Sequence, residues 1–359
     1  MSTKPFRSII VLLWLAFCAA GCAAAPAAAP QTPSPAPYLK IERITPAPTP
    51  SPTPVPDALT AGEGVYTFAW ISDPQHYSES HPEIFCAMTR FLQKERERLN
   101  LAYVVHTGDM VQDRGAPEQW DAAEAAMRML ADIPHGVLAG NHDVGTSRRD
   151  FSEFNAHFGG AHMEDKPYCG GIYEGGMGHY DLIDAGDTRF VFAYMGYQPD
   201  EAAIRWLTSV FNQYPERVGV LAVHDYFKTD LSLYDSGRAL QKAVLAQCPN
   251  VYLVLSGHRY NVAAVPVSFD DDGDGTAERT VYQMIANYQA AGSEGGSAFC
   301  RLMRLRASCA PTPTPLIWRI TVIVTSPARR MRNTLWILPT RRSRCRCPGL
   351  DSGLHDMIK

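Results

Sequence analysis

Short apolar runs alternate with helical patterns along residues 64–304 of the 359-residue chain. Five runs that end in Gly or polar residues are predicted to be buried strands, at 66–71, 101–105, 136–139, 218–223 and 251–255. Apolar side chains at helical spacing predict helices around 84–92 and 120–130, and two more helices are expected over 201–211 and 240–246. Strands that alternate with helices in this way indicate an α/β domain.

An acidic segment at residues 270–275 separates two further apolar runs. It resembles the start of a calcium-binding loop, but Val281 stands where the last ligand of such a loop must be Glu. We therefore interpret the segment as a hairpin turn between strands at 265–267 and 280–282.

A side chain that can bind a metal follows each of the five predicted strands. In chain order these residues are Asp73 and Gln75, Asp109, Asn141, His224 and His258. Ligands of α/β sheets bind in the crevice outside the carboxyl ends of the strands, so the five loops are expected to converge on one site.

Carboxylates, amides and imidazoles make up this set, and no cysteine belongs to it. Such ligands suit Mn, Fe, Zn or Mg rather than metals bound by thiolates. Two ions about 3.5–4 Å apart can hold the attacking and leaving oxygens of a displacement and activate a water, and Asp109 is suited to bridge them. Nearby residues also have structural interpretations, His106 as a hydrogen-bonded core histidine and Asp143 and Asp225 as turn or cap residues.

The ordered motifs resemble the calcineurin-like metallophosphoesterase family across about residues 66–304. The motifs are Asp-x-Gln at 73–75, Gly-Asp at 108–109, Gly-Asn-His-Asp at 140–143, a His at 224 and Gly-His at 257–258. Gly-Asn-His-Asp is the specific one, whereas Gly-Asp or Gly-His alone is common. The resemblance implies two packed mixed β-sheets flanked by helices, in a four-layer sandwich.

The resemblance also implies a role for each site residue. Asp109 would bridge two metal ions, Mn, Fe or Zn, with Asp73 and Gln75 on the first and Asn141, His224 and His258 on the second. His142 would donate a proton to the leaving oxygen, and Asp143 would orient its imidazole. The implied reaction is hydrolysis of a phosphomonoester or phosphodiester by a metal-bridged hydroxide.

Two residues depart from the family pattern and weaken the first metal site. Gln75 stands where the family usually has His, and its neutral amide oxygen is a weaker donor than imidazole. Tyr260 also replaces a usual His, and a phenol coordinates well only as phenolate. His76 could partly compensate. The first metal is therefore expected to bind more loosely than the second, and a surface-binding lipoprotein with impaired catalysis is the alternative function.

The first 22 residues have the features of an export signal. Lys4 and Arg7 precede an apolar run at 9–17, and small residues at 19–21 form a cleavage site before Cys22. This resembles a bacterial lipoprotein signal with an acylated Cys22, although Ala19 stands where Leu is usual. The protein is then expected to be exported and lipid-anchored to the cell membrane, facing outward, or secreted if Cys22 is not acylated. Residues 23–63, rich in Pro, Ala and Thr, are predicted to be a semi-rigid spacer.

Charge is divided unevenly along the chain. The net charge is −4, but from Arg301 onward eleven arginines and one lysine face only Asp351 and Asp356, so this end carries about +10 and the rest about −14. No nucleic-acid partner is expected, because the domain body is acidic and has no basic stripe. Residues 305–359 are interpreted as a basic tail that touches an anionic polymer, as a disordered extension or, as we favour, as the product of a shifted reading frame.

Overall fold

The computed structural model describes residue 61, residues 64–145 and 149–287, and the backbone of three strands between residues 298 and 339. These residues belong to one compact unit, Val55–Lys359. The predicted signal peptide with Cys22, and nearly all of the predicted spacer, lie outside the described residues. Within the described part of the chain, no helix is both long and apolar enough to span a lipid bilayer.

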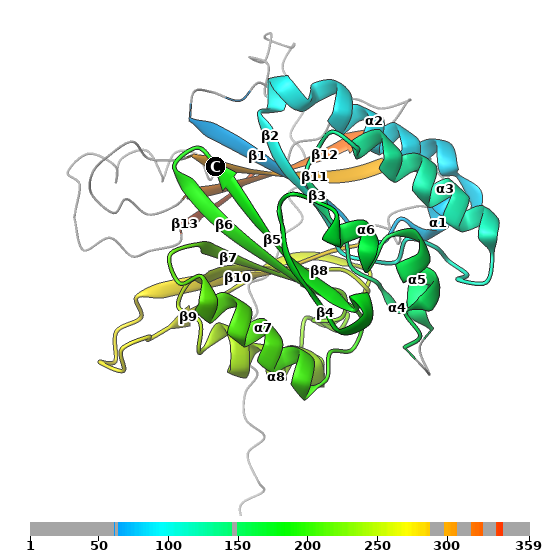
Figure 1. Cartoon of the computed structure of the whole chain (residues 1–359). Helices are drawn as coiled ribbons and strands as arrows, with labels where there is room; N and C mark the ends of the chain where they lie inside the picture. Colours follow the sequence, from blue (N-terminus) through cyan, green and yellow to red (C-terminus); the bar gives the residue numbers. More distant parts are fainter. Residues whose placement is uncertain are drawn as a thin grey trace, which may run out of the picture. The chain divides into compact units, whose positions relative to one another are not determined.

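Two mixed β-sheets form the centre of the domain (Figure 1). The first has the strand order β13-β12-β11-β1-β2-β3. Its strands are β1 (Val65–Ile71), β2 (Leu101–His106), β3 (His135–Gly136), β11 (Ala298–Arg306), β12 (Ile317–Thr325) and β13 (Leu335–Pro339). Because β1 pairs parallel with β2 and antiparallel with β11, segments far apart in the sequence lie side by side in this sheet.

The second sheet has the strand order β4-β5-β6-β7-β8-β10-β9. Its strands are β4 (Cys169–Tyr173), β5 (Gly178–Ala185), β6 (Thr188–Met195), β7 (Val218–Val223), β8 (Val251–Ser256), β9 (Asn261–Phe269) and β10 (Arg279–Asn287). Strands β6, β7, β8 and β10 run parallel, whereas β4, β5 and β9 pair antiparallel towards the edges.

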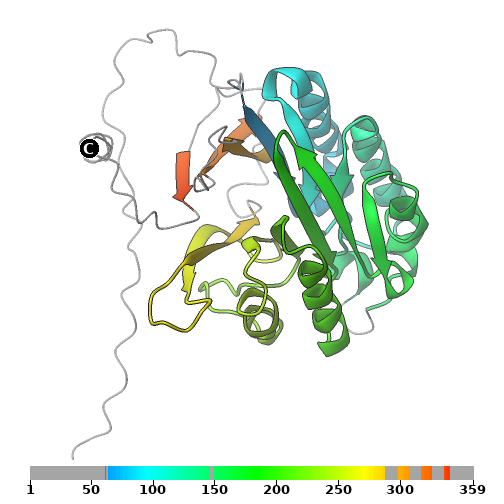
Figure 2. The same cartoon turned by 60° about the vertical axis from the view of Figure 1, so that its left-hand side comes forward.

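Helices cover the outer face of each sheet (Figures 1 and 2). On the first sheet these are α1 (Gln75–Ser80), α2 (Pro82–Leu99) and α3 (Pro117–Met127), and on the second α7 (Glu201–Gln213) and α8 (Asp235–Leu240). Short helices α4 (Asn141–Val144), α5 (Ser152–His157) and α6 (Ala161–Glu164) follow β3.

Local chemistry fixes the ends of the two longest helices. Pro82 occupies the start of α2, where its fixed φ suits a helix, and Asn100 ends α2 in the left-handed conformation. α7 begins after Asp200, whose carboxylate accepts a hydrogen bond from the backbone N of Ala203 at 2.9 Å. The apolar faces of both helices are buried against their sheets.

Side chains from both sheets fill the space between them. Along β1, Phe68 and Trp70 belong to this inter-sheet core, whereas Ala69 and Ile71 belong to the core beneath the helices, as expected for a strand buried on both faces. The layers are therefore helices, sheet, sheet and helices. This confirms the predicted α/β fold of two packed mixed sheets flanked by helices.

Most predicted elements are present. The strands predicted at 66–71, 101–105, 218–223 and 251–255 are β1, β2, β7 and β8, and the predicted hairpin is β9–β10, in which Val267 pairs with Val281. The helices predicted at 84–92, 120–130 and 201–211 are α2, α3 with the 3-10 turn Arg128–Leu130, and α7. Two predictions were wrong in part. The run at 136–139 contains only the end of the short β3, and 240–246 is largely a π-helical turn, Gln241–Leu245, that follows α8.

Several strands were not predicted. Buried His179 and Asp181 interrupt the apolar pattern of β5, and Gly170 and Gly171 weaken that of β4. The strands β12 and β13 lie within residues 305–359, for which the sequence predicted no regular structure. β11 reaches Arg306, past the predicted domain boundary at 304. The shifted reading frame inferred for this end stays a prediction.

Phe192 of β6 tests the inter-sheet core. Its buried ring lies 4.5 Å from the ring of Tyr103 on the opposite sheet. Phe192→Ala is expected to lower the free energy of unfolding by about 3–5 kcal/mol, because it removes buried aromatic surface and leaves a cavity. Urea denaturation measures this change, with the exposed Arg189→Ala of the same strand as a control that should change it by less than about 0.5 kcal/mol. Equal effects of the two substitutions would contradict this description of the core.

Candidate functional site

Strand-end loops from both sheets meet at one place. The backbone N of Asp73, after β1, donates to the O of Gly108, after β2, at 3.1 Å. The backbone N of His258, after β8, donates to the Asp73 carboxylate at 2.9 Å. The backbone N of Gly257 donates to the O of His224, after β7, at 3.1 Å. These bonds fix the relative positions of four loops that the sequence predicted to converge.

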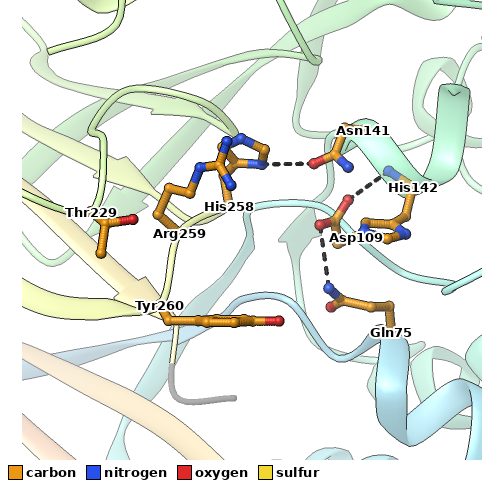
Figure 3. Close-up of a pocket in the computed structure, with 8 residues that line it drawn as sticks. All are labelled: Gln75, Asp109, Asn141, His142, Thr229, His258, Arg259 and Tyr260. Carbon is orange, nitrogen blue, oxygen red and sulfur yellow. Dashed lines mark hydrogen bonds between the residues drawn. The ribbon is translucent and has the colours of Figure 1, made fainter. Parts of the chain in front are cut away.

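Asp109, Asn141 and His258 line the pocket (Figure 3), and together with the buried His224 they form the floor of the site. Nε2 of His224 lies 3.2 Å from Oδ2 of Asp109 and 3.1 Å from Oδ1 of Asn141. Nδ1 of His258 lies 2.7 Å from the same Asn141 oxygen. One ligand atom each of Asp109, His224 and His258 lies within 4.8 Å of the other two. A carboxylate, an amide oxygen and two imidazoles this close together can bind a metal ion.

Gln75 lies on the opposite side of Asp109 from Asn141 (Figure 3). Its Nε2 is 3.4 Å from Oδ2 of Asp109. Oε1 of Gln75 is buried and has no hydrogen-bond partner among the described residues. A buried acceptor without a partner costs free energy, and a cation beside Asp109 would satisfy it. The amide therefore fits the role of a metal ligand.

Asp73 is a buried carboxylate beside the Ser72 hydroxyl. Burial, together with the negative charge of Asp109, raises the pKa of Asp73 to about 7, although the charge of His224 opposes this rise. A cation bound nearby would favour its ionised form. The donor set as a whole thus fits metal ions.

His224 is completely buried, and its ring orientation is fixed. Nδ1 lies 2.8 Å from the backbone O of Thr107 and donates its proton to that carbonyl, which leaves Nε2 facing Asp109. Burial disfavours the imidazolium, but the carboxylates of Asp109 and Asp73 and the backbone O of Thr107 together raise the pKa of His224 to about 10. A metal ion bound to Nε2 would take the place of the proton that Nε2 carries in the imidazolium.

Three of the candidate ligands have a left-handed backbone, with φ of 55° at Asp73, 56° at Asp109 and 73° at His258. Non-glycine residues rarely adopt this conformation, and it persists only where the surrounding structure holds it, often at functional sites. Each of these residues follows the end of its strand. The unusual turn therefore sets the direction in which the ligand points.

Two glycines leave room for the carboxylates. A Cβ at Gly140 would collide with the carboxylate of Asp109, and a Cβ at Gly257 would collide with that of Asp73. Close approach of neighbouring side chains explains the glycine at both positions.

Asp143 has a different partner from the predicted one. Its carboxylate accepts hydrogen bonds from the backbone N of Gly140 at 2.8 Å, of Met110 at 2.8 Å and of Val111 at 3.1 Å. These bonds tie the loop after β2 to the loop after β3. Asp143 therefore positions the two loops instead of orienting the ring of His142.

His142 lines the pocket from the first turn of α4. Its Nδ1 lies 2.8 Å from the backbone O of Gln112, and its backbone N donates to Oδ1 of Asp109 at 2.9 Å. Because Nδ1 donates to a carbonyl, Nε2 is the atom available to a substrate. The ring is thus oriented by a backbone oxygen, which no sequence motif indicates.

Tyr260 lies at the rim of the pocket and is 53% exposed. Its hydroxyl points towards the side of Gln75 (Figure 3). His76 was expected to compensate in part for Gln75, but it does not line this pocket. Its Nδ1 instead lies 3.1 Å from the carboxylate of Glu79 on the same helix. The first metal site therefore gains no imidazole from His76.

His106 has the structural role expected of it, whereas Asp225, expected to be a turn or cap residue, instead joins two loops. Nδ1 of the buried His106 accepts a hydrogen bond from the backbone N of Gly108 at 3.1 Å. Burial, with the charge of His224, lowers the pKa of His106 to about 3, so this ring is neutral. The Asp225 carboxylate accepts from the backbone N of Gln198 at 2.9 Å.

The pocket above the ligands has a volume of about 180 Å³. It is lined by Gln75, Asp109, Asn141, His142, Thr229, His258, Arg259 and Tyr260. Thr229 and Arg259 were not predicted. Arg259 directly follows the Gly-His motif, and that position is a signal that could have identified it, whereas nothing in the sequence around Thr229 marks it.

A second acidic group forms the turn between β9 and β10. Carboxylate oxygens of Asp270, Asp272, Asp274 and Glu278 lie within 4.8 Å of one another, and all four residues are exposed. The Asp270 carboxylate accepts hydrogen bonds from the backbone N of Gly273 and of Gly275, at 2.7 Å each. The segment is the hairpin turn that the sequence predicted, and we assign no metal to it.

The family model described as calcineurin-like phosphoesterase matches residues 66–260, more than half of the chain. The chain belongs to the calcineurin-like phosphoesterase family. This confirms the predicted family and, at the level of the domain, the predicted class of enzyme, a metal-dependent phosphoesterase.

Three other proteins are similar to this chain over part of their length. The protein YvnB of Bacillus subtilis (strain 168) is 38% identical over 250 residues, which are 69% of this chain and 19% of YvnB, so the chain spans about a fifth of that relative. Purple acid phosphatase PPD1 from yellow lupin (Lupinus luteus) seeds has a TM-score of 0.48 and 12% identity, covering 71% of this chain and 51% of its own. The NAD nucleotidase NadN of Haemophilus influenzae has a TM-score of 0.41 and 13% identity, and the match covers 77% of this chain and 50% of NadN.

Gln75→His tests the weakness of the first metal site. The substitution restores the imidazole that the family usually has, so the variant is expected to keep about two metal ions per chain through dialysis against a chelator, and the unchanged protein about one. Mass-spectrometric metal analysis after Mn loading measures the difference. His76→Gln, one residue away, is the control and should change nothing. Retention of two ions by the unchanged protein would show that the first site is not weak.

Proposed function

We propose that the domain hydrolyses a phosphate ester with the help of two metal ions, Mn, Fe or Zn. The observation that carries the proposal is the arrangement around Asp109, where imidazole, amide and carboxylate ligands lie within hydrogen-bond distance in a buried floor. The unpartnered amide oxygen of Gln75 supports a second cation on the other side of Asp109.

Each ligand has a place in this proposal. Asp109 would be shared by the two metal ions, Asp73 and Gln75 would hold the first, and Asn141, His224 and His258 the second. The ions would activate a water as nucleophile and offset the negative charge of the phosphate. The weak donors Gln75 and Tyr260 make the first ion the one that is lost and replaced.

His142 is the proposed proton donor. Its ring lines the pocket, and its Nδ1 is bound to the backbone O of Gln112, so Nε2 faces the space where a leaving oxygen would lie. A proton held on Nε2 can pass to that oxygen as the ester bond breaks. The Asp143 carboxylate contributes indirectly, because it holds the loops that carry Asp109 and His142.

The proposed substrate is a phosphomonoester or a phosphodiester, and we propose no nucleic-acid partner. The alternative, a surface-binding lipoprotein with one structural metal, differs from an enzyme in turnover. The proposal therefore depends on an activity measurement.

Asp109→Asn tests the proposed reaction. Hydrolysis of p-nitrophenyl phosphate and of bis-p-nitrophenyl phosphate with added Mn is measured for the unchanged protein and the variant. At least one substrate should be turned over, and Asp109→Asn should lower kcat/KM at least about 100-fold, because it weakens the shared metal ligand.

The exposed Asp187→Asn, in the turn after β5, makes the same chemical change outside the site and should keep full activity. Failure of the unchanged protein to hydrolyse either ester would favour the binding protein. Full activity of a folded Asp109→Asn variant would rule out the proposed centre.

We also propose that the protein is exported and anchored to the outer face of the cell membrane through an acylated Cys22. The signal-like segment at 1–22 and the Pro-rich spacer support this location. Cys22→Ala should remove the processed protein from the membrane fraction. Immunoblots of fractionated cells would then show the variant in the medium or as the precursor that keeps its signal peptide. Membrane association of a variant that has lost its signal peptide would rule out the anchor.

A further inference from the structure

Arg259 is a cationic side chain in the wall of the pocket that the proposed mechanism does not use. It directly follows His258 and lines the same cavity as Gln75 and His142. Among the described residues it forms no ion pair, whereas other arginines, such as Arg279 with Asp271 at 2.7 Å, are paired with carboxylates. Arg259 is exposed at the mouth of the pocket, where its positive charge favours an anionic ligand.

Tyr234 holds this arginine in place. Nε of Arg259 donates to the hydroxyl of Tyr234 at 2.6 Å, and the guanidinium lies 5.8 Å from the centre of the same ring. Nζ of Lys228 lies 6.0 Å from that ring and adds a further positive charge. Of the three guanidinium nitrogens of Arg259, only Nε donates a hydrogen bond within the described part of the chain. Its two terminal nitrogens have no hydrogen-bond partner in the described part of the chain, and they form the fork that binds phosphate oxygens.

The charge of Arg259 reaches the candidate metal ligands. Arg259 directly follows His258 and lines the same pocket as Asp109 and Asn141. In Figure 3 the guanidinium lies beside His258, on the side of the pocket opposite His142. A phosphate between these walls would have its leaving oxygen near His142 and a terminal oxygen near Arg259.

We infer that Arg259 is a substrate-binding residue that selects phosphomonoesters over phosphodiesters, an inference that rests on the proposed function. A phosphomonoester has three terminal oxygens and a charge of up to −2, whereas a diester has two terminal oxygens and a charge of −1. When two terminal oxygens are bound by the two proposed metal ions, only the monoester has a third terminal oxygen that can accept hydrogen bonds from the Arg259 guanidinium. Arg259 therefore stabilises the bound monoester and contributes little to a bound diester.

Arg259→Gln and Arg259→Lys test this inference in the full protein with Mn. Arg259→Gln should raise KM for p-nitrophenyl phosphate at least about tenfold, since it removes a hydrogen bond to a charged group, with a smaller change in kcat. KM for bis-p-nitrophenyl phosphate should change less than about twofold. Arg259→Lys should recover part of the loss, because it keeps the charge but not the fork. The exposed Arg189→Gln is the matched control and should leave both substrates unchanged.

Binding of inorganic phosphate gives a readout that does not need turnover. Phosphate should raise the Tm of the unchanged protein and of Arg189→Gln, and this shift should be lost in Arg259→Gln. Equal losses with both esters, or an unchanged KM and phosphate shift, would overturn the inference. If the unchanged protein hydrolyses neither ester, the proposed function fails, and the phosphate shift alone decides whether Arg259 binds phosphate. If Arg259→Gln does not fold, Arg259→Lys decides through the same two measurements.

Discussion

The site depends on the burial of one carboxylate, that of Asp109, among groups that can share a cation. Its oxygens contact Nε2 of His224, Nε2 of Gln75 and the backbone N of His142, which follow three different strands. A buried carboxylate is costly unless opposite charge and hydrogen bonds surround it. Burial raises the pKa of Asp109, but His224 and His142 together bring it below its usual value. Metal ions would serve the same purpose more fully and would release the proton of His224.

The rest of the domain holds this carboxylate in place. The aromatic core between the sheets fixes the strands, and the carboxyl ends of those strands fix the loops. Left-handed turns at Asp73, Asp109 and His258 then aim the ligands, and Gly140 and Gly257 let the carboxylates pack against neighbouring backbone. The hydrogen bonds of Asp143 lock two loops together. Strain in the turns is thus supported by rigid elements, as a preorganised site requires.

The layers of the fold and the convergence of the candidate ligands could be predicted from the sequence, but the details between them could not. The ligands were predictable because each follows an apolar strand in an ordered set, and strand ends converge in an α/β sheet. β5 was missed because buried His179 and Asp181 obscure its apolar pattern. The contact between His142 and the O of Gln112 was missed because backbone oxygens leave no trace in a sequence. The role of Arg259 could not be predicted from the sequence, because it depends on the pocket that Arg259 lines and on the lack of an acidic partner among the described residues.

The central claim is that Asp109 lies between two metal ions. Anomalous X-ray diffraction from crystals of the full protein soaked in MnCl₂ tests it most directly. Two anomalous peaks are expected, one on each side of the Asp109 carboxylate and about 3.5–4 Å apart, with the weaker peak beside Gln75. Crystals with Mn bound only at the acidic turn between β9 and β10, and no peak beside Asp109, would show that Asp109 does not hold two metal ions.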